Sequence, residues 1–332
     1  MIMIIKSNEI KKSEIVKIIQ IFNSDTKLNI KEISDNLGYS RQTFYNKFEK
    51  LKKEKIIGQF TININPNISP NNLKYVLLEV KTNPQEPELV KNLKLIPQLR
   101  ILDGILGDYS LFALFIFNSS RDYYNALNKI DEVMSKSYFK KYQIIDTIKI
   151  FKTNGIALGN KTVNNQHELD KIDYIILKIL QKRQELSPIS TYEIKNIIKE
   201  SFQKVLKELN KDDISQSTIH NRIKKLESKG VILNYTVNFN PKKMGFKGKY
   251  HVRIKPKNPS KYNFIASKLE KNQYITDLFR IGEQYGLFAI VRVKKVEDYA
   301  NFIKTLYDTK EIEDTFTYFV LDELLPFQNF VI

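Results

Sequence analysis

The sequence has 332 residues, of which 42% are hydrophobic, and it contains no Cys and only three His residues. This length suits about two domains with packed cores. The composition excludes disulfides and thiolate metal centres, so we expect no metal, no cofactor and no catalytic residues. The 54 Lys and Arg residues outnumber the 37 Asp and Glu residues, which gives a net charge of +17 and favours a polyanionic partner.

No apolar run approaches the roughly 20 residues that a membrane helix needs. The opening residues 1–5 are apolar but form too short a stretch for the core of a signal peptide. We therefore expect a cytoplasmic protein without a membrane partner. The charge alone leaves open whether the Lys residues meet a polyanion or are simply solvated, and its distribution along the chain is more informative.

Residues 1–71 predict three helices followed by one strand. Ser40 is a good N-cap for the third helix, and Phe44 and Phe48 lie at helical spacing on its apolar face. Apolar and polar residues then alternate from 60 to 64, the pattern of a half-buried strand. Three short helices and a strand are typical of a winged helix-turn-helix domain.

Residues 72–153 predict the order strand, helix, strand, strand, helix, strand, which defines the ferredoxin-like split βαβ fold. The expected elements are 75–80, 86–95, 100–106, 111–117, 120–135 and 143–151. Residues 154–166 are polar and contain two Gly residues, so they are the predicted linker to the second half of the chain.

The same order recurs in the second half, where residues 167–245 match the helical part and residues 246–332 match the ferredoxin-like part. The segment 40–60 aligns without gaps with 215–235 at a constant offset of 175. Leu111-Phe112-Ala113 recurs as Leu287-Phe288-Ala289 at an offset of 176. These matches predict a tandem duplication of an α+β fold, two units that each join a winged helix-turn-helix domain to a ferredoxin-like domain.

The second helical part departs from the first by an insertion. It holds roughly 14 additional residues around 199 to 213. Phe202, Val205, Leu206 and Leu209 share one helical face there. This spacing predicts that the second helix of this part is lengthened.

The excess positive charge gathers on the two helical parts. Residues 1–70 and 161–245 carry 11 of the 17 excess charges on less than half of the chain, as expected of surfaces that meet phosphates. Arg, Gln and Asn side chains can read base edges, and Lys and Ser suit phosphates. The predicted DNA contacts are Ser40, Arg41, Gln42, Tyr45, Asn46, Lys50, Lys53, Ser215, Gln216, Ser217, His220, Asn221, Arg222, Lys225 and Lys229.

The second helical part closely resembles the helix-turn-helix signature of the Lrp/AsnC (feast/famine) transcription regulators. The residues that carry the resemblance are Ser215, Thr218, Arg222, Ile223, Leu226, Glu227, Gly230, Val231 and Ile232. Residues 169–180 resemble the usual opening of that family. The resemblance implies double-stranded DNA as a partner, dimerisation through the ferredoxin-like sheets, and further association into a homo-oligomer.

The same resemblance implies a small-molecule effector near a glycine turn of each ferredoxin-like part. The residues at these turns are Gly107, Asp108, Tyr109, Gly282, Glu283, Gln284 and Tyr285. Ser110 and Gly286 stand near the point where the family carries an acidic residue, which argues against an amino acid as the effector. Tyr109 and Tyr285 could line such a pocket or simply pack at the strand ends. In the first helix-turn-helix, Lys47 and Lys55 replace the usual Arg and Gly, so that head departs from the signature.

We predict a sequence-specific transcription regulator, an intramolecular pseudo-dimer with two non-identical DNA-reading heads, and not an enzyme. One alternative is an enzyme similar to the siroheme decarboxylases, which resemble this family and use His- and Arg-bearing motifs near the glycine turn. Residues 107–112 and 282–288 contain neither His nor Arg. Another alternative is a DNA-organising protein of low sequence specificity, which the charge also permits.

Overall fold

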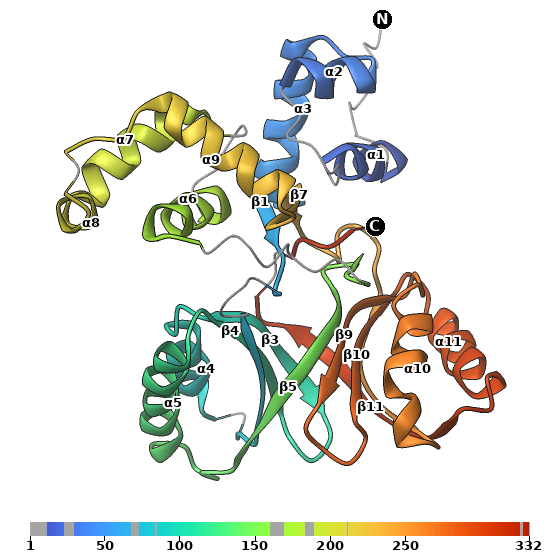
Figure 1. Cartoon of the computed structure of the whole chain (residues 1–332). Coiled ribbons are helices and arrows are strands. Elements are labelled where there is room, and N and C mark those ends of the chain that lie inside the picture. The colour runs from blue at the N-terminus through green and yellow to red at the C-terminus, as the bar shows by residue number, and fades with distance from the viewer. Residues whose placement is uncertain are drawn as a thin grey trace, which may run out of the picture.

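The two predicted winged helix-turn-helix parts, called here the first and second heads, lie side by side at one end of a β-barrel (Figure 1). Further helices cover the outer faces of the barrel. This computed structural model describes residues 12–22, 30–67, 73–83, 85–159, 169–182, 189–210, 212–325 and 328–331. The residues between these ranges, among them 68–72 and 160–168, lie outside the description. The predicted boundary at 71/72 and most of the predicted linker therefore fall outside it.

The first head consists of three helices and a strand, as predicted. These are α1 (Lys12–Phe22), α2 (Ile30–Leu37), α3 (Arg41–Lys53) and β1 (Ile57–Ile64). The Ser40 hydroxyl caps α3 by accepting a hydrogen bond from the Thr43 backbone N–H at 3.1 Å. Phe44 and Phe48 are buried, and Phe48 stacks on Phe60 of β1 with ring centroids 5.0 Å apart. The apolar face inferred from spacing is therefore the face that fixes α3 to the strand.

The second head contains one element more than the first. Its elements are α6 (Lys171–Lys182), α7 (Thr191–Ser201), α8 (Gln203–Glu208), α9 (Gln216–Ser228) and β7 (Ile232–Phe239). The prediction of a single lengthened helix is wrong, because α7 ends at Ser201 and Phe202 adopts φ −129° and ψ 23°, outside the helical region. Phe202 and Leu206 still pack on the head's apolar core, so the insertion adds a short second helix rather than a longer one.

The ferredoxin-like elements occur in both halves of the chain in the predicted order. The first half gives β2 (Lys74–Val80), α4 (Pro87–Lys94), β3 (Leu99–Leu106), β4 (Leu111–Phe117), α5 (Ser120–Ser135) and β5 (Tyr142–Thr153). The second half gives β8 (Gly248–Pro256), α10 (Tyr262–Leu269), β9 (Ile275–Ile281), β10 (Leu287–Val293), α11 (Val296–Asp308) and β11 (Ile312–Glu323), with a short 3-10 turn at Pro259–Lys261 before α10. These predicted elements are confirmed.

The predicted linker begins inside the sheet. Asn154 and Gly155 form a tight turn with φ of 49° and 77°, and β6 (Ile156–Ala157) then pairs antiparallel with β5. A Cβ atom on Gly155 would come within 2.9 Å of the Val331 backbone, so both the turn and this close approach favour glycine. Residues 154–157 therefore extend the sheet.

The strands of both halves join one antiparallel sheet in the order β2-β4-β3-β11-β8-β10-β9-β5-β6. A further pairing of β2 with β5 closes every strand except β6 into a barrel. The pairs β3–β11 and β5–β9 join the two halves. Helices α4 and α5 cover the outside of the first half, and α10 and α11 cover the second (Figure 1). Both halves contribute side chains to the core inside the barrel.

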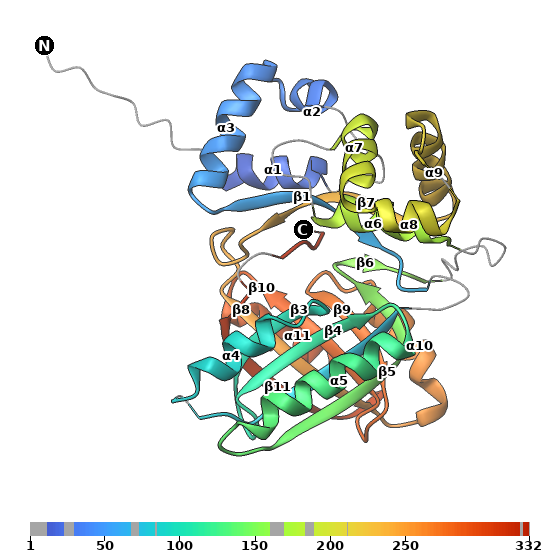
Figure 2. The ribbon, with the colours of Figure 1, turned by 90° about the vertical axis from the view of Figure 1, so that its left-hand side faces the viewer.

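The two heads are joined by their strands. β1 and β7 pair antiparallel as a separate two-stranded sheet, in which Thr61 lies opposite Thr236. Figure 2 shows this strand pair between the heads and the barrel, with α3 and α9 on opposite sides of the pair of heads. The pairing gives the heads a defined relative placement.

Candidate nucleic-acid interface

The outer face of α3 is polar and exposed because its opposite face is buried by Phe44 and Phe48. The exposed predicted contacts are Ser40, Arg41, Gln42, Tyr45, Asn46 and Lys53. Gln42 donates a hydrogen bond from Nε2 to Asn46 Oδ1 at 3.0 Å, which aligns the two amides along the helix. Lys50 is half-buried, with its Nζ 3.9 Å from Glu54 Oε1. This face presents amide and cationic groups together.

The outer face of α9 is arranged in the same way. Its exposed predicted contacts are Ser215, Gln216, Ser217, His220, Asn221 and Lys225, whereas Lys229 is half-buried at the helix end. Ser215 caps α9 by accepting a hydrogen bond from the Thr218 N–H at 3.1 Å. Gln216 donates from Nε2 to Thr191 Oγ1 of α7 at 2.9 Å, which fixes the start of α9 against the preceding helix. Each head thus offers one polar helix face, and the two faces differ in sequence.

Arg222, a further predicted DNA contact, is half-buried and ion-paired, unlike its exposed neighbours on this face. Its Nη1 lies 2.7 Å from Asp170 Oδ2 and 2.7 Å from Asp173 Oδ1, at the start of α6. Burial would lower the pKa of Arg222, but the two carboxylates outweigh it and raise that pKa above its usual value. The guanidinium therefore holds α9 against α6, because it compensates a carboxylate, Asp173, that is 2% exposed.

The first head has a matching ion pair between two of its helices, which was not predicted from the sequence. Lys47 lies 175 residues before Arg222, and its Nζ is 2.7 Å from Glu14 Oε1 of α1. Tyr39 donates its hydroxyl to the same carboxylate, and burial together with that hydrogen bond raises the pKa of Tyr39 to about 12. The constant offset between Lys47 and Arg222 is the signal that could have revealed the shared role.

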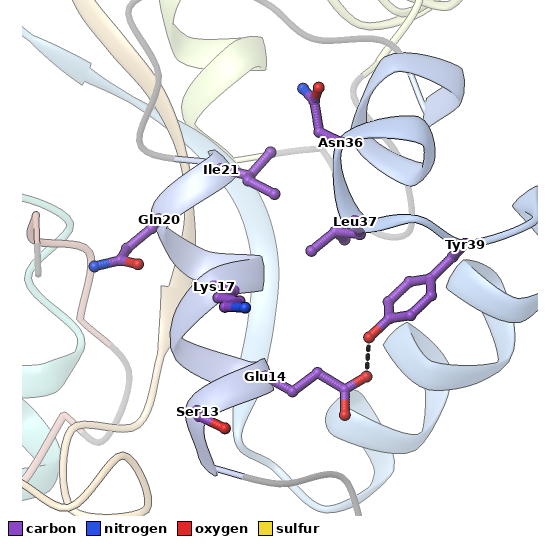
Figure 3. A pocket seen from close by; sticks show the side chains of 8 residues that line it. All are labelled: Ser13, Glu14, Lys17, Gln20, Ile21, Asn36, Leu37 and Tyr39. Carbon is purple, nitrogen blue, oxygen red and sulfur yellow. Dashed lines mark hydrogen bonds between the residues drawn. The ribbon is translucent and has the colours of Figure 1, made fainter.

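A hollow of about 540 Å³ lies beside this ion pair, between α1 and the end of α2 (Figure 3). It is lined by Ser13, Glu14, Lys17, Gln20, Ile21, Asn36, Leu37 and Tyr39. Tyr39 points toward Glu14 across one side of it. Because α1 and α2 form its walls, it is distinct from the polar face of α3.

The glycine turns carry their tyrosines half-buried against neighbouring strands. Tyr109 donates its hydroxyl to Gln143 Oε1 at 3.2 Å, and Tyr285 donates to Asp314 Oδ2 at 3.1 Å. Gly107 is required by packing, since a Cβ atom there would lie 2.3 Å from the Tyr318 ring. The other predicted residues of these turns, Asp108, Gly282 and Gln284, are exposed.

Glu283 is the turn residue that reaches the barrel interior. Its Oε1 lies 2.9 Å from Nε of Arg253, whose Nη2 lies 2.7 Å from Glu79 Oε1. Burial raises the pKa of Glu79 despite the opposing effect of Arg253. Glu283 was predicted as a turn residue, but Arg253 and Glu79 were not, because they lie on β8 and β2, away from the turn in sequence.

A second buried ionic cluster spans the two halves of the barrel. The Asp103 carboxylate on β3 lies 2.6 Å from Lys249 Nζ and 2.9 Å from His251 Nε2, both on β8. Burial alone would raise the pKa of Asp103, but Lys249 and His251 lower it to about 2. Burial lowers the pKa of His251, against the effect of Asp103, so the imidazole is neutral near pH 7.

Within the described ranges of the chain, no group of three or more His, Asp or Glu side chains comes together as a metal-binding cluster. None of the helices in the same ranges combines the length and apolarity needed to cross a membrane.

The chain is similar over part of its length to known transcriptional regulators. Residues 250–329 match the Lrp/AsnC ligand-binding domain family. The chain is 32% identical over 154 residues to the HTH-type transcriptional regulator FL11 of Pyrococcus furiosus, an alignment that covers 46% of this chain and 89% of that protein. It is 30% identical over 135 residues to the HTH-type transcriptional regulator Ptr1 of Methanocaldococcus jannaschii, covering 41% of this chain and 79% of that protein.

Nearly the whole chain has a counterpart among solved structures. The siroheme decarboxylase NirDL aligns with a TM-score of 0.55 and 14% identity over 94% of this chain and 91% of that one. At this identity the likeness is one of fold.

Proposed function

The chain belongs to the Lrp/AsnC family, and we propose that it is a sequence-specific DNA-binding transcription regulator built as an intramolecular pseudo-dimer. The FL11 and Ptr1 proteins that it resembles are HTH-type transcriptional regulators. Each of these alignments covers less than half of this chain and more than three quarters of the relative. Such coverage supports a chain that contains two regulator-sized units.

We assign the units as the sequence predicts. Residues 1–71 and 167–245 are the DNA-reading heads, and residues 72–153 and 246–332 are the two halves of the barrel. The observation that most directly supports the proposal is the β1–β7 register. In it Thr61 lies opposite Thr236, its equivalent in the second copy of the repeat, 175 residues later. A dimer of two identical subunits would pair a residue with its own copy in this way.

Each head would place its polar helix in the major groove of double-stranded DNA. The amides of Gln42 and Asn46 on α3, and of Asn221 on α9, suit bidentate contacts with adenine, while Lys53 and Lys225 suit phosphates. Because the exposed residues of α3 and α9 differ, the two half-sites should differ as well. We do not assign this role to Arg222, because its guanidinium is ion-paired with Asp170 and Asp173.

We place a small-molecule effector, where one acts, at the glycine turns around Tyr109 and Tyr285, and we do not expect an amino acid there. Ser110 and Gly286 supply no carboxylate for an ammonium group. Glu283, the acidic residue at the second turn, already contacts Arg253. Chains would associate further into homo-oligomers, which sedimentation of the pure protein at several concentrations would measure.

The proposal is tested by selecting genomic DNA fragments with the pure protein, with and without candidate metabolites. We expect a defined set of fragments that outcompete random duplexes at physiological salt. Equal binding of selected and random duplexes would contradict the regulator and favour the low-specificity DNA organiser. A change in the selected set when a metabolite is added would identify the effector.

The siroheme decarboxylase NirDL supplies a second candidate, because its fold matches 94% of this chain. Siroheme is a polycarboxylate, so its site would need free cations near the turns. Arg280 instead stacks on Tyr262, 3.6 Å from the ring centroid, and donates to the Gly286 carbonyl, while Arg253 is paired with Glu79 and Glu283. Incubation of the pure protein with siroheme would reveal turnover by a change in absorbance, and we expect none.

A further inference from the structure

Glu79 and Arg253 occupy matched positions in the two halves of the barrel. Glu79 lies opposite Phe112 in the β2–β4 ladder, and Arg253 lies opposite Phe288 in the β8–β10 ladder. Phe112 and Phe288 are the central residues of the repeated Leu-Phe-Ala segment. A position that is acidic in one half is therefore basic in the other.

These matched positions meet inside the barrel. Arg253 Nη2 lies 2.7 Å from Glu79 Oε1, and the two side chains are 6% and 0% exposed. Beside them the Phe112 and Phe288 rings stack with centroids 5.3 Å apart and an angle of 5° between their planes. Residues at equivalent places in the two halves thus face each other, as they would across a two-fold axis.

A barrel made from two identical halves would bring like charges together at this point. Two first halves would place Glu79 against a second Glu79, and two second halves would place Arg253 against a second Arg253. Two facing Glu79 carboxylates would have no counter-ion, which is strongly unfavourable in a buried place. Two facing Arg253 guanidinium groups would each keep Glu283 of their own half but would repel each other. Only the combination of one first half with one second half gives an ion pair between the halves.

The buried cluster around Asp103 leads independently to the same conclusion, that the two halves of the barrel must be different. Asp103 lies opposite Phe112 in the β3–β4 ladder, and Phe279 lies opposite Phe288 in the β9–β10 ladder, so Asp103 and Phe279 are matched. By the same comparison His251 is matched by Leu77, since their ladder partners, Ile290 and Leu114, lie 176 residues apart.

Identical halves would therefore leave these groups without partners. Two first halves would set Asp103 against Leu77, and two second halves would set His251 against Phe279. Each case buries a polar group that has lost its hydrogen bond or ion pair, which is costly. The 2.9 Å contact between Asp103 and His251 forms only when the halves are different.

We propose that these buried pairs act as a pairing code, which allows a first half to combine with a second half and excludes barrels built from two identical halves. Two chains could exchange halves, but every barrel would still contain one of each. The code therefore keeps the two non-identical heads together, including in any assembly of several chains. The inference rests on the two-unit organisation proposed above and does not depend on DNA binding.

The test exchanges the charges in full-length chains that all carry E283Q, so that position 79 supplies the carboxylate facing residue 253. E79R and R253E should each lower the thermal unfolding midpoint or the soluble yield, and the double variant E79R/R253E should recover most of either loss. The control reverses an exposed ion pair, K171E with E208K, and its single changes should have little effect. A double variant no better than the worse single variant would overturn the inference.

A second measurement separates a pairing code from an ordinary ion pair. A flexible insertion within residues 160–168 allows two chains to exchange halves. A tagged E79R chain should then capture a co-produced R253E chain at least tenfold more efficiently than a co-produced chain with Glu79 and Arg253 intact. Equal recovery of both chains, including no recovery of either, would overturn the inference. Neither readout involves DNA, so a failure here is distinct from a failure to bind a specific site.

Discussion

Thr61 lies directly opposite Thr236 in the ladder between β1 and β7, and 175 residues separate them along the chain. Two residues further along β1, Asn63 donates from Nδ2 to Asn234 Oδ1 at 2.8 Å, and both side chains are buried. The strand pair is thus nearly symmetric about the two threonines. The pair joins the heads to each other, and Asn154, which directly follows β5, donates from Nδ2 to Asn63 Oδ1 at 2.8 Å and so links the pair to the barrel.

Asn221→Ala should weaken preference for the selected DNA site more than it weakens overall affinity. The reason is that an amide reads a base edge, whereas Lys225 is expected to meet a phosphate. Lys225→Ala should weaken binding to all sequences similarly and reduce the slope of log affinity against log salt by about 1. Equilibrium binding to selected and random duplexes at several salt concentrations measures both. Lys129→Ala, an exposed change on α5, is the control. If Lys225→Ala reduced site preference more than Asn221→Ala, the assigned recognition face would be wrong.

Arg222→Ala should destabilise the second head and leave its base preference unchanged. Removal of the guanidinium takes away the cation beside the buried Asp173 carboxylate, which keeps its hydrogen bond from the Asp170 N–H, at a cost of about 2 kcal/mol. Urea unfolding should show the loss, and Arg222→Lys should recover part of it, since Lys47 makes the corresponding contact in the first head. Lys224→Ala, an exposed change on the same helix, is the control. Altered base preference at unchanged stability would restore Arg222 to the DNA contacts.

Asp103→Asn should destabilise the barrel more at neutral pH than in acid. At pH 7 the loss of the carboxylate beside Lys249 and His251 should cost about 3 kcal/mol. The folded pKa of about 2 lies below the ordinary value of 3.8, so stabilisation by the ionised carboxylate is fully present above pH 4. It is lost as the pH falls through 2. Denaturant unfolding of both proteins from pH 7 to pH 2 should show their difference shrinking by about 2 kcal/mol, and a constant difference would contradict the prediction.

The spacing between the two half-sites should matter strongly. Because β1 and β7 hold α3 and α9 in one arrangement, the heads cannot follow half-sites that move apart or rotate around the helix axis. Inserting about 5 base pairs, half a turn of B-DNA, should reduce affinity to that of one head alone. Titrations of duplexes with graded insertions measure the effect. Affinity that is independent of spacing would indicate heads that move separately.

The sequence predicted much of this arrangement because the repeat and the apolar spacing are local patterns. The helix from Ser40, the strands around Leu111 and Leu287, and their recurrence at one offset all follow from residues close together in the chain. The closure of the barrel through β3–β11 and β5–β9 could not be predicted in this way. Those pairings join strands far apart in sequence, and alternation within one strand does not reveal its neighbour.

The candidate site was predictable to the same extent. The exposed faces of α3 and α9 follow from the buried positions Phe44 and Ile219 by helical geometry. The ion pair of Arg222 could not be predicted in this way, because its partner Asp173 lies 49 residues earlier and is buried only once α6 packs on α9. Likewise the break at Phe202 was hidden by an apolar pattern that suits one helix or two.

The most direct test is a hydroxyl-radical footprint of the protein on a selected genomic site. The chain should protect two blocks of unequal sequence, with Asn46→Ala weakening protection of one block and Asn221→Ala weakening the other. Lys129→Ala should leave both blocks unchanged. The proposal that the two heads read different sequences would be contradicted by a single protected block. It would also be contradicted by a strictly palindromic site whose two halves respond identically to either substitution.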